Sequence, residues 1–431
     1  MRIRPEFERE IRSNRTRFAG AGIREVDGER AAHGVPLPAS SGSFPEDRGI
    51  ASESPWDQNS SAAACEIVIG APSFWQRAAA DIASARKRVL VQALTFEGDA
   101  TGQAVAAALQ QTRARDRRVL VDDFSRVVVS DRFVLSLHFL ASASFRAEVR
   151  ATGDMFRALV AGGVGVRRTN PIAGRVYRYG LRNHKKLIVA DDVAYIGGVN
   201  FSDHNFAWHD LMLRIEGAGA ADFLASDFDA TWESRAAFAK ARFGDLGLYA
   251  LDGCHNAAGF ADLFEAIARA ERRIDVVSPY LSFPFAEALG AAARRGVAVD
   301  VLAPSSNNKP MVRHYLLDAA RRLGFALRLV PEMFHLKAML IDGRLLVLGS
   351  SNFDFPSYYS MEEYLAVVEE PRLIEAFRDT VLRPLRAASV SADGLRSPLW
   401  HVLRSRLVLQ MGRAVVAGIG RTPRSAAEWP R

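Results

Sequence analysis

One short pattern occurs twice in the chain, and this repetition constrains the fold more than any other feature of the sequence. The pattern is H-x-K-x4-D, followed by a turn that contains glycine and then by an asparagine. Its specified residues are His184, Lys186, Asp191 and Asn200 in the first copy, and His335, Lys337, Asp342 and Asn352 in the second. So many specified residues do not recur in the same order by chance. We therefore expect the chain to contain two related halves.

The residues between the Lys and the Asp are apolar in both copies, at 187–190 and 338–341. A short apolar run that enters a turn predicts a buried β-strand. In an extended strand the side chains at i and i+2 share a face, so each His should point the same way as the Lys that follows it. Two such faces brought together would form a pocket with two imidazoles and two ammonium groups. This pocket would suit a phosphate diester.

Each residue type in the pattern has a role in phosphate chemistry. An imidazole attacks phosphorus when it is neutral and protonates a leaving alkoxide when it is charged, so the two roles need two histidines. The lysines, the Asn amides and the turns at Gly198 and Ser350 are candidates for holding the phosphoryl oxygens. Asp191 and Asp342 could orient an imidazole or could only close the turn after the strand. The sequence leaves both roles open.

The doubled motif resembles the signature of the phospholipase D superfamily, and the resemblance extends from about Ile67 to about Leu385. The order of the elements and the segment 209–233 most resemble bacterial cardiolipin synthases or phosphatidyltransferases without transmembrane helices. Alternating helix and strand patterns in each half also indicate an α/β fold. We expect two tandem phospholipase D-like domains, each a mixed, mostly parallel sheet flanked by helices. They should pack with pseudo-two-fold symmetry around one shared active site.

The resemblance also implies a mechanism, in which transfer proceeds in two steps through a phosphohistidine, without a metal ion or another cofactor. His184 would be the nucleophile, and His335 would be the general acid and later the base. Members of the superfamily often carry an acidic residue after the second motif that orients the opposing His. Glu362 and Glu363 both fit that place. We favour Glu363, with Asp210 as its counterpart in the first half.

Four segments are expected along the chain. Residues 1–60 lack apolar periodicity and are predicted to be a disordered leader. The two phospholipase D-like domains should occupy residues 61–245 and 246–388, followed by a basic tail at 389–431. The tail holds a candidate helix from about Leu399 to Ile419 with an apolar stripe. This helix could lie on an anionic membrane or pack on its own domain.

The two halves differ in length in two places. Asp191 and Gly197 are six positions apart, whereas Asp342 and Gly349 are seven positions apart. A change of one residue within a strand would reverse its faces, but in a turn it only alters the connection, so the site should be preserved. The first half is also longer, mostly within 125–183. The end of that segment is rich in Arg and Tyr and could receive an anionic headgroup, stack on a base or form a solvated loop.

Charge and composition narrow the class of partner. The formal net charge is +7, which favours anionic surfaces of any kind, whether acidic lipid or nucleic acid. The two cysteines give no disulfide framework and fit a reducing compartment. No part of the sequence has the roughly eighteen consecutive apolar residues that indicate a transmembrane helix. We expect a cytoplasmic protein, peripheral on the inner face of the bacterial membrane.

Several functions remain open at this point. The leading hypothesis is phosphatidyl transfer from an anionic phospholipid such as phosphatidylglycerol, at the membrane surface, to an alcohol acceptor, which would form cardiolipin or a related lipid. Hydrolysis of the same substrate, or metal-independent phosphodiesterase activity on nucleic acid, are alternatives. A catalytically silent binding protein is a third class. The presence of every key residue in both motifs argues against it. The sequence identifies no protein partner.

Overall fold

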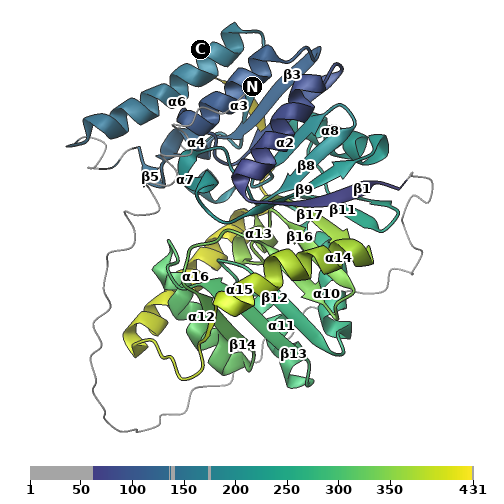
Figure 1. Ribbon diagram of the computed structural model, residues 1–431. Helices are drawn as coiled ribbons and strands as arrows, with labels where there is room; N and C mark the ends of the chain where they lie inside the picture. The colour runs from purple at the N-terminus through teal and green to yellow at the C-terminus, as the bar shows by residue number, and fades with distance from the viewer. Residues whose placement is uncertain (1–61, 135, 137–140, 173–175, 430–431) are drawn as a thin grey trace. The chain divides into compact units, whose positions relative to one another are not determined.

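Each half of the chain builds one large mixed β-sheet covered by helices (Figure 1). The computed structural model describes residues 62–134, 136, 141–172 and 176–429. These residues belong to one compact unit, Trp56–Arg431. The leader predicted for residues 1–60 lies outside the described part of the chain.

The first sheet contains eight strands in the order β1-β9-β8-β7-β2-β3-β6-β19. Their bounds are β1 (Ala64–Ile69), β2 (Arg88–Ala93), β3 (Asp116–Asp122), β6 (Gly165–Thr169), β7 (Leu187–Ala190), β8 (Val193–Gly197), β9 (Leu211–Glu216) and β19 (Ala426–Glu428). The segment between β3 and β6 also forms a small hairpin of β4 (Val128–Val129) and β5 (Arg132–Phe133).

The second sheet contains nine strands in the order β10-β11-β17-β16-β15-β12-β13-β14-β18. Their bounds are β10 (Ala239–Phe243), β11 (Leu246–Asp252), β12 (Arg273–Val277), β13 (Ala298–Pro304), β14 (Ala326–Val330), β15 (Ala338–Ile341), β16 (Leu345–Gly349), β17 (Glu362–Val368) and β18 (Val390–Ser391). The run β17-β16-β15-β12-β13-β14 repeats the run β9-β8-β7-β2-β3-β6 of the first sheet. The repeat in the sequence is therefore a repeat in the topology.

The sheets are mixed, as expected, but the prediction of mostly parallel strands is wrong. Parallel pairing is confined to β2-β3-β6 and β12-β13-β14, and the other pairings in both sheets are antiparallel. The motif strands β7 and β15 each continue through a tight turn into the next strand, β8 or β16. A strand that turns back through so short a connection can pair with its predecessor only in the antiparallel direction.

The helices cover the sheets in layers (Figure 1). Apolar side chains of α2, α3 and α6 pack on one face of the first sheet, and those of α10, α11 and α12 pack on one face of the second. The longer helices are α2 (Ala71–Ser84), α3 (Ala100–Gln111), α6 (Ala143–Ala161), α8 (Ala218–Trp232), α10 (Ala261–Arg269), α11 (Phe285–Arg294), α12 (Pro310–Leu323), α14 (Pro371–Phe377), α15 (Arg383–Ala388) and α16 (Leu399–Ile419). The shorter ones are α4 (Phe124–Val127), η1 (Val176–Gly180), α7 (Asp203–Phe206), α9 (Asn256–Gly259), α13 (Phe355–Tyr359) and the π-helical η2 (Arg378–Leu382).

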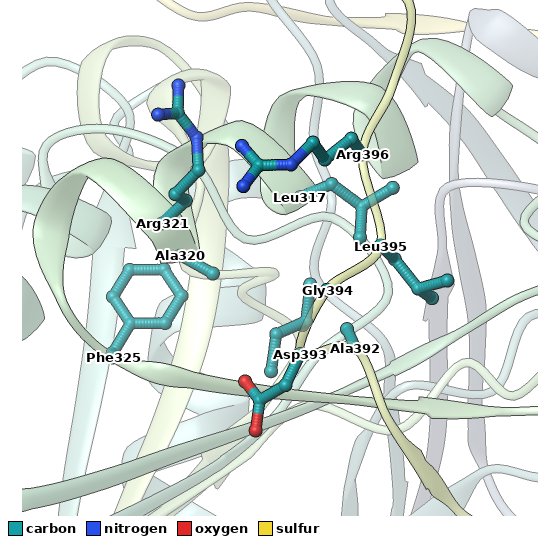
Figure 2. A pocket seen from close by; sticks show the side chains of 10 residues that line it. Leu317, Ala320, Arg321, Phe325, Ala392, Asp393, Gly394, Leu395 and Arg396 are labelled. Carbon is teal, nitrogen blue, oxygen red and sulfur yellow. The ribbon is translucent and has the colours of Figure 1, made fainter. Parts of the chain in front are cut away.

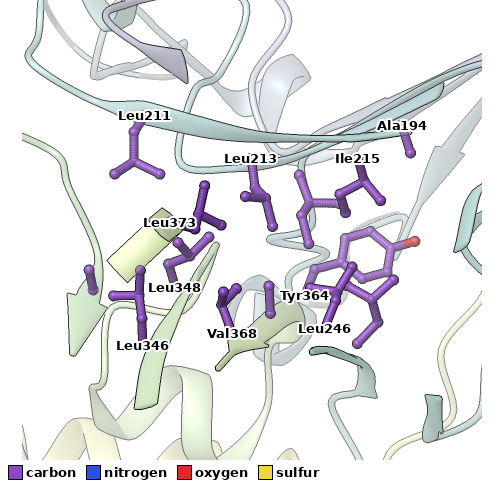
Figure 3. Close-up of a cluster of buried hydrophobic side chains, with 14 of the residues drawn as sticks. Ala194, Leu211, Leu213, Ile215, Leu246, Leu346, Leu348, Tyr364, Val368 and Leu373 are labelled. Carbon is purple, nitrogen blue, oxygen red and sulfur yellow. The ribbon is translucent and has the colours of Figure 1, made fainter. Parts of the chain in front are cut away.

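The other faces of the two sheets contribute to one continuous hydrophobic core. Leu213 and Ile215 of β9 lie in the same buried cluster as Leu346 and Leu348 of β16 (Figure 3). Helix α8 of the first half and α14 of the second complete this cluster. Because successive residues of a strand face opposite sides, each sheet can pack on its own helices and on the other half at once.

The boundary between the halves lies earlier than residue 245. Strand β10 pairs with β11 of the second sheet, so the chain crosses between the sheets after Trp232 and before Ala239. The tail is also tied to both sheets, because β18 pairs with β14 and β19 returns to pair with β6. Helix α16 occupies the residues predicted for it. Among the described residues, no helix is long and apolar enough to cross a membrane.

The shared core predicts that the two halves unfold together. Leu213→Ala in the first sheet and Leu348→Ala in the second each remove a fully buried side chain, and each should cost about 2–5 kcal/mol of unfolding free energy. Both variants should lower the midpoint of the same urea transition, followed by circular dichroism. The exposed Leu407→Ala serves as control and should change it little. Two transitions, each sensitive to only one of the variants, would contradict a common core.

Candidate active site

The segments that lead into the motif strands β7 and β15 place His and Lys side chains together in the interior. His184, Lys186, His335 and Lys337 are all buried, although they come from opposite halves of the chain. Lys185, which lies between the first pair, points the other way and binds Asp227 of α8 with Nζ–O distances of 2.7 and 2.9 Å. The alternation expected of an extended strand therefore separates a structural lysine from the lysine of the site.

Each histidine is held by a carboxylate from the other half. The Nδ1 atom of His184 lies 3.0 Å from both carboxylate oxygens of Glu363, and the Nδ1 atom of His335 lies 2.9 Å from Oδ2 of Asp210. Neither Nε2 atom has a hydrogen-bond partner among the residues that the structure describes. Such a bond at Nδ1 fixes the ring and leaves Nε2 for chemistry.

The backbone repeats this crossed arrangement. The His184 N–H donates to the Glu362 carbonyl at 2.9 Å, and the His335 N–H donates to the His209 carbonyl at 2.8 Å. Each histidine is thus joined by its backbone to the residue before the carboxylate that holds its side chain. The two halves make the same pair of contacts in both directions, as a pseudo-two-fold arrangement requires.

The structure places Glu363, and not Glu362, against the histidine. The side chain of Glu362 points to the opposite side of β17, where its oxygens accept hydrogen bonds from Asn170 and Asn183 at 2.7 and 2.9 Å. Burial raises the pKa of Glu362 to about 7. Glu362 therefore supports the segment before His184 without contacting the imidazole.

The two orienting carboxylates have different surroundings. Glu363 also accepts hydrogen bonds from the hydroxyls of Ser350 and Ser357. Burial opposes its charge, but His184, Lys186 and the Ser350 hydroxyl outweigh burial and hold the pKa of Glu363 below its usual range. Burial raises the pKa of Asp210 to about 6, despite the nearby Lys337. Thus Glu363 is the more firmly ionised partner.

The expectation that Gly198 and Ser350 bind phosphate is corrected by the structure. Their backbone N–H groups donate to the carbonyls of Leu211 and Tyr364, at 3.1 and 3.0 Å, because the antiparallel ladder continues one residue past the strand. A Cβ atom at Gly198 would lie 2.3 Å from Oδ1 of Asp210. Gly198 makes room for one orienting carboxylate, and the Ser350 hydroxyl binds the other.

Each lysine of the motif is bound to the backbone of its histidine, and burial disfavours the charged form of both lysines. The Nζ atom of Lys186 donates to the His184 carbonyl at 2.8 Å, and Lys337 makes the equivalent bond to His335. Burial, together with the nearby Lys337, lowers the pKa of Lys186 to about 7, and burial lowers that of Lys337 to about 8. Burial also lowers the pKa of His184 to about 4. An anion in the site would favour the charged forms of all these groups.

The two asparagines after the motifs lie buried beside this cluster. Oδ1 of Asn200 accepts a hydrogen bond from the Thr95 N–H at 3.3 Å. Oδ1 of Asn352 is buried with no hydrogen-bond partner among the described residues. A buried carbonyl oxygen without a donor is costly unless a ligand or water supplies one. A phosphoryl oxygen is itself an acceptor, so only the Nδ2 groups of these side chains can donate to it. Both amides remain candidates for holding phosphoryl oxygens.

The aspartates of the motifs do not belong to the catalytic cluster, which corrects their assignment as catalytic residues. Asp191 accepts hydrogen bonds from the backbone N–H groups of Arg86, Lys87 and Arg88 at 2.8–2.9 Å. Asp342 accepts from the N–H groups of residues 271–273 at 2.8–3.0 Å. Burial opposes both charges slightly, but these donors hold both pKa values below the usual range.

The geometry of the turns explains this role of the aspartates. Asp191 and Asp342 have positive φ angles of 51° and 50°, a conformation that Asp adopts more readily than most residues. Each lies at the far end of its motif strand, where it fixes the loop that enters β2 or β12. The extra residue of the second motif lies in the turn, since Ala190 pairs with Val193 but Ile341 pairs with Leu345. The difference in length therefore leaves the strand faces intact.

Several residues around the site were not predicted from the sequence. The ring of His335 lies 5.3 Å from that of Trp208 and 6.0 Å from that of Tyr280. The ammonium of Lys309 lies 4.3 Å from the centre of the Tyr280 ring, and its charge contributes to lowering the pKa of His335. Trp208 immediately precedes His209 and Asp210, so its place next to a predicted site residue could have indicated that it lies near the site. Lys309 has no comparable signal in the sequence.

The Arg- and Tyr-rich segment before the first motif is only partly solvent-facing. Arg182 is buried and forms an ion pair with Asp122, and it also donates to the backbone carbonyls of Asn170 and Arg178. This arginine therefore holds the loop in place and is not open to a headgroup or a base. Tyr179 is exposed and packs near Phe133 of β5, with ring centres 5.7 Å apart.

Two H-x-K-x4-D motifs that join in one buried site define a protein of the phospholipase D type. The model of the family described as "Cardiolipin synthase, PLD-like domain" matches residues 79–232 and 263–383, and the chain belongs to this family.

Individual relatives agree with this assignment. The minor cardiolipin synthase ClsB of Bacillus subtilis (strain 168) is 31% identical over an alignment of 267 residues, and the match covers 54% of this chain and 63% of that protein. Cardiolipin synthase A of Pseudomonas syringae pv. syringae (strain B728a) is 28% identical over an alignment of 300 residues, and the match covers 64% of this chain and 59% of that protein. The chain thus spans less than two thirds of the length of these curated relatives.

The fold has a counterpart of known structure. The crystal structure of phosphatidylserine synthase from Haemophilus influenzae Rd KW20 matches with a TM-score of 0.63 over 82% of this chain and 94% of that chain, at 13% identity. At this identity the likeness concerns the fold alone. It confirms the expected arrangement of two phospholipase D-like α/β domains.

The position of Asp191 predicts a loss of stability without a loss of chemistry. Asp191→Ala removes an acceptor for three backbone N–H groups, which should cost about 1–3 kcal/mol of unfolding free energy. The turnover of the folded variant should stay near that of the wild type. Urea unfolding and steady-state kinetics check the two parts, with the exposed neighbour Asp192→Ala as matched control. Unchanged stability with abolished turnover would return Asp191 to the catalytic group.

The raised pKa of Asp210 predicts a pH-dependent difference in stability. The folded protein keeps a proton on Asp210 up to about pH 6, whereas the ordinary value of this carboxyl is 3.8. The wild type therefore loses stability from this group as the pH rises through that window, and Asp210→Asn does not. The unfolding free energy of Asp210→Asn minus that of the wild type should rise from about pH 4 to about pH 6. A flat or falling difference, or the same rise in Asp192→Asn, would contradict this assignment.

Proposed function

We propose that the chain transfers a phosphatidyl group from a phospholipid to an alcohol, in two steps, through a phosphohistidine on His184. The observation that carries the proposal is the crossed pair of imidazoles, each held at Nδ1 by a carboxylate of the other half and each with Nε2 free of partners among the described residues. Two imidazoles with this geometry supply the nucleophile and the proton that a phosphodiester exchange requires.

In the first step Nε2 of His184 attacks phosphorus, and a P–N bond forms as the P–O bond to the leaving alcohol breaks. The proton on Nε2 of His335 passes to the leaving oxygen. Glu363 is the more firmly ionised of the two carboxylates, which favours His184 as the nucleophile because the ring gains positive charge when it bonds to phosphorus. The phosphate anion itself raises the pKa of His335, so that His335 carries its proton when substrate is bound.

In the second step the neutral His335 accepts a proton from the incoming hydroxyl. The oxygen of that hydroxyl attacks phosphorus, the P–N bond breaks and His184 is restored. Lys186, Lys337 and the amides of Asn200 and Asn352 donate to the non-bridging oxygens, where negative charge is concentrated. Water in place of the alcohol gives hydrolysis by the same route.

The membership of the family favours lipid substrates. The relatives named cardiolipin synthase suggest phosphatidylglycerol both as donor and as acceptor, with cardiolipin and glycerol as products. The positive charge of the site suits the phosphate of any diester, and the net charge of +7 suits an anionic lipid surface.

Lipid product analysis tests the proposal. The purified protein, incubated with phosphatidylglycerol vesicles in EDTA, should yield cardiolipin and glycerol, measured by mass spectrometry. His184→Ala and His335→Ala should each lower the rate by roughly a thousandfold or more, because each removes a group that the other cannot replace. His314→Ala, on α12 and bound to Ser397, is the matched control and should keep its activity.

The covalent intermediate gives a second measurement. Quenched reactions with phosphate-labelled lipid should carry an acid-labile, base-stable label on the protein that is absent from His184→Ala. Phosphatidic acid alone would show that hydrolysis replaces transfer. Cleavage of oligonucleotides without any lipid product would assign the site to nucleic acid instead, and near wild-type turnover in both histidine variants would exclude the shared site.

A further inference from the structure

Helix α16 exposes a broad apolar face that no other described residues of the chain cover. Most of the strongly exposed large apolar side chains of the described residues lie on it: Leu399 (73%), Trp400 (62%), Leu403 (55%), Leu407 (61%), Val408 (41%), Met411 (61%) and Val415 (56%). Isolated exposed apolar residues are ordinary on a protein surface, whereas a contiguous run of this kind marks an interaction site.

The exposed face lies opposite the face by which α16 is anchored. Val402, Ser405, Leu409 and Val416 are buried and pack the helix on its own domain. At 3.6 residues per turn these side chains occupy one side of the helix, and the exposed apolar residues occupy the other half of its surface. Helix α16 therefore packs on its own domain and also presents an apolar face that no other described residues cover. From the sequence, packing on the domain and contact with a membrane were alternatives.

The charged residues of α16 itself are all arginines. Residues 394–427 contain no Asp or Glu but six arginines. Arg396, Arg404 and Arg421 are exposed, and the guanidinium of Arg404 lies 5.8 Å from the centre of the Trp400 ring, with its stem along the helix surface. Arg406 is used within the fold, in an ion pair with Asp318. Apolar residues with Trp and bordering arginines are typical of a helix that lies in the interface of an anionic bilayer.

The segment before the helix continues this surface. Residues 392–396, which precede α16, form one wall of a pocket with a volume of about 170 Å³ (Figure 2). The pocket is lined by apolar residues such as Leu317, Phe325 and Leu395, together with Arg321, Arg396 and Asp393. None of the motif residues lines it, so it is separate from the active site.

The location of α16 ties this surface to the catalytic groups. Gly412 of α16 lies against Phe355 of α13, since a Cβ atom there would be 3.1 Å from its ring. The same short helix carries Ser357, whose hydroxyl binds Glu363. The end of α16 also packs on η1, where Ile419 lies against Gly180 just before the first motif. A surface bound by α16 would therefore lie next to elements that contact the site.

We infer that α16 is a membrane-docking helix, which lays its apolar face into the interface of a bilayer that contains anionic lipid. A second copy of the chain is a poorer occupant, because a symmetric contact would bring the same arginine-rich face against itself. Nucleic acid is also poorer, because the centre of the face is aliphatic and offers only Trp400 for stacking. This inference goes beyond the proposed transfer reaction and does not depend on it.

Vesicle sedimentation tests the docking helix. The probe is a set of vesicles of phosphatidylcholine, with or without phosphatidylglycerol, and the variant is Leu403→Gln/Leu407→Gln/Met411→Gln, which keeps residues of good helix propensity. The full chain should bind the mixed vesicles more tightly than pure phosphatidylcholine, and the triple variant should bind them at least about tenfold more weakly. Val160→Gln, at an exposed apolar residue of α6, is the matched control.

A second measurement reports on the helix itself. The tryptophan emission of the protein should shift to shorter wavelength on the mixed vesicles, and this shift should be lost in Trp400→Phe. The unfolding midpoint of the triple variant, and its rate on a water-soluble phosphodiester, should match those of the wild type, which separates docking from folding and from chemistry. Arg396→Gln/Arg404→Gln should reduce the preference for phosphatidylglycerol, and added salt should do the same.

The inference is overturned if the triple variant binds vesicles like the wild type, or if Val160→Gln loses as much binding as the triple variant. It is also overturned if the triple variant keeps vesicle binding and instead loses self-association in sedimentation velocity or loses affinity for oligonucleotides. Failure of lipid turnover with intact vesicle binding would count against the proposed reaction alone.

Discussion

The crossed bonds between imidazole and carboxylate are the interaction on which the rest of the structure depends. Glu363 of the second half holds His184 of the first, and Asp210 of the first half holds His335 of the second. Neither half therefore contains an oriented histidine of its own. The continuous core between the sheets and the paired backbone bonds serve to keep these partners in contact, because an error of about 1 Å would misdirect both rings.

The two halves of the site differ in the surroundings of their carboxylates, Asp210 and Glu363. Gly198 and Ser350 occupy equivalent places at the ends of β8 and β16, yet one leaves space for the shorter Asp210 and the other donates a hydroxyl to the longer Glu363. Both carboxylates are buried, but the neighbours of Glu363 hold its pKa below its usual range, whereas burial raises the pKa of Asp210. Two identical halves would have offered no physical reason for one histidine to attack and the other to transfer protons.

The local rules of a strand predicted much of the site, and the failures arose where the answer depended on distant parts of the chain. His184 and Lys186 share a face because side chains alternate, which is a property of the strand alone. The choice between Glu362 and Glu363 depends on which face of β17 meets His184, because both side chains contact residues of the first half. The role of Asp191 depends on backbone amides about a hundred residues earlier in the chain. The excess of antiparallel pairing was missed because helix-strand alternation describes only β2-β3-β6 and its counterpart.

The return of the chain to its first sheet also bears on how the protein is made. Strand β19 covers the edge of β6, and Trp429 lies 4.1 Å from Phe156, measured between ring centres. Until residues 426–429 have left the ribosome, β6 is an open edge with unpaired N–H and C=O groups. Such an edge can pair with the wrong chain. Because β19 follows the whole second half in the sequence, β6 keeps this unpaired edge while the second half is synthesised, and pairing with residues 426–428 then closes it.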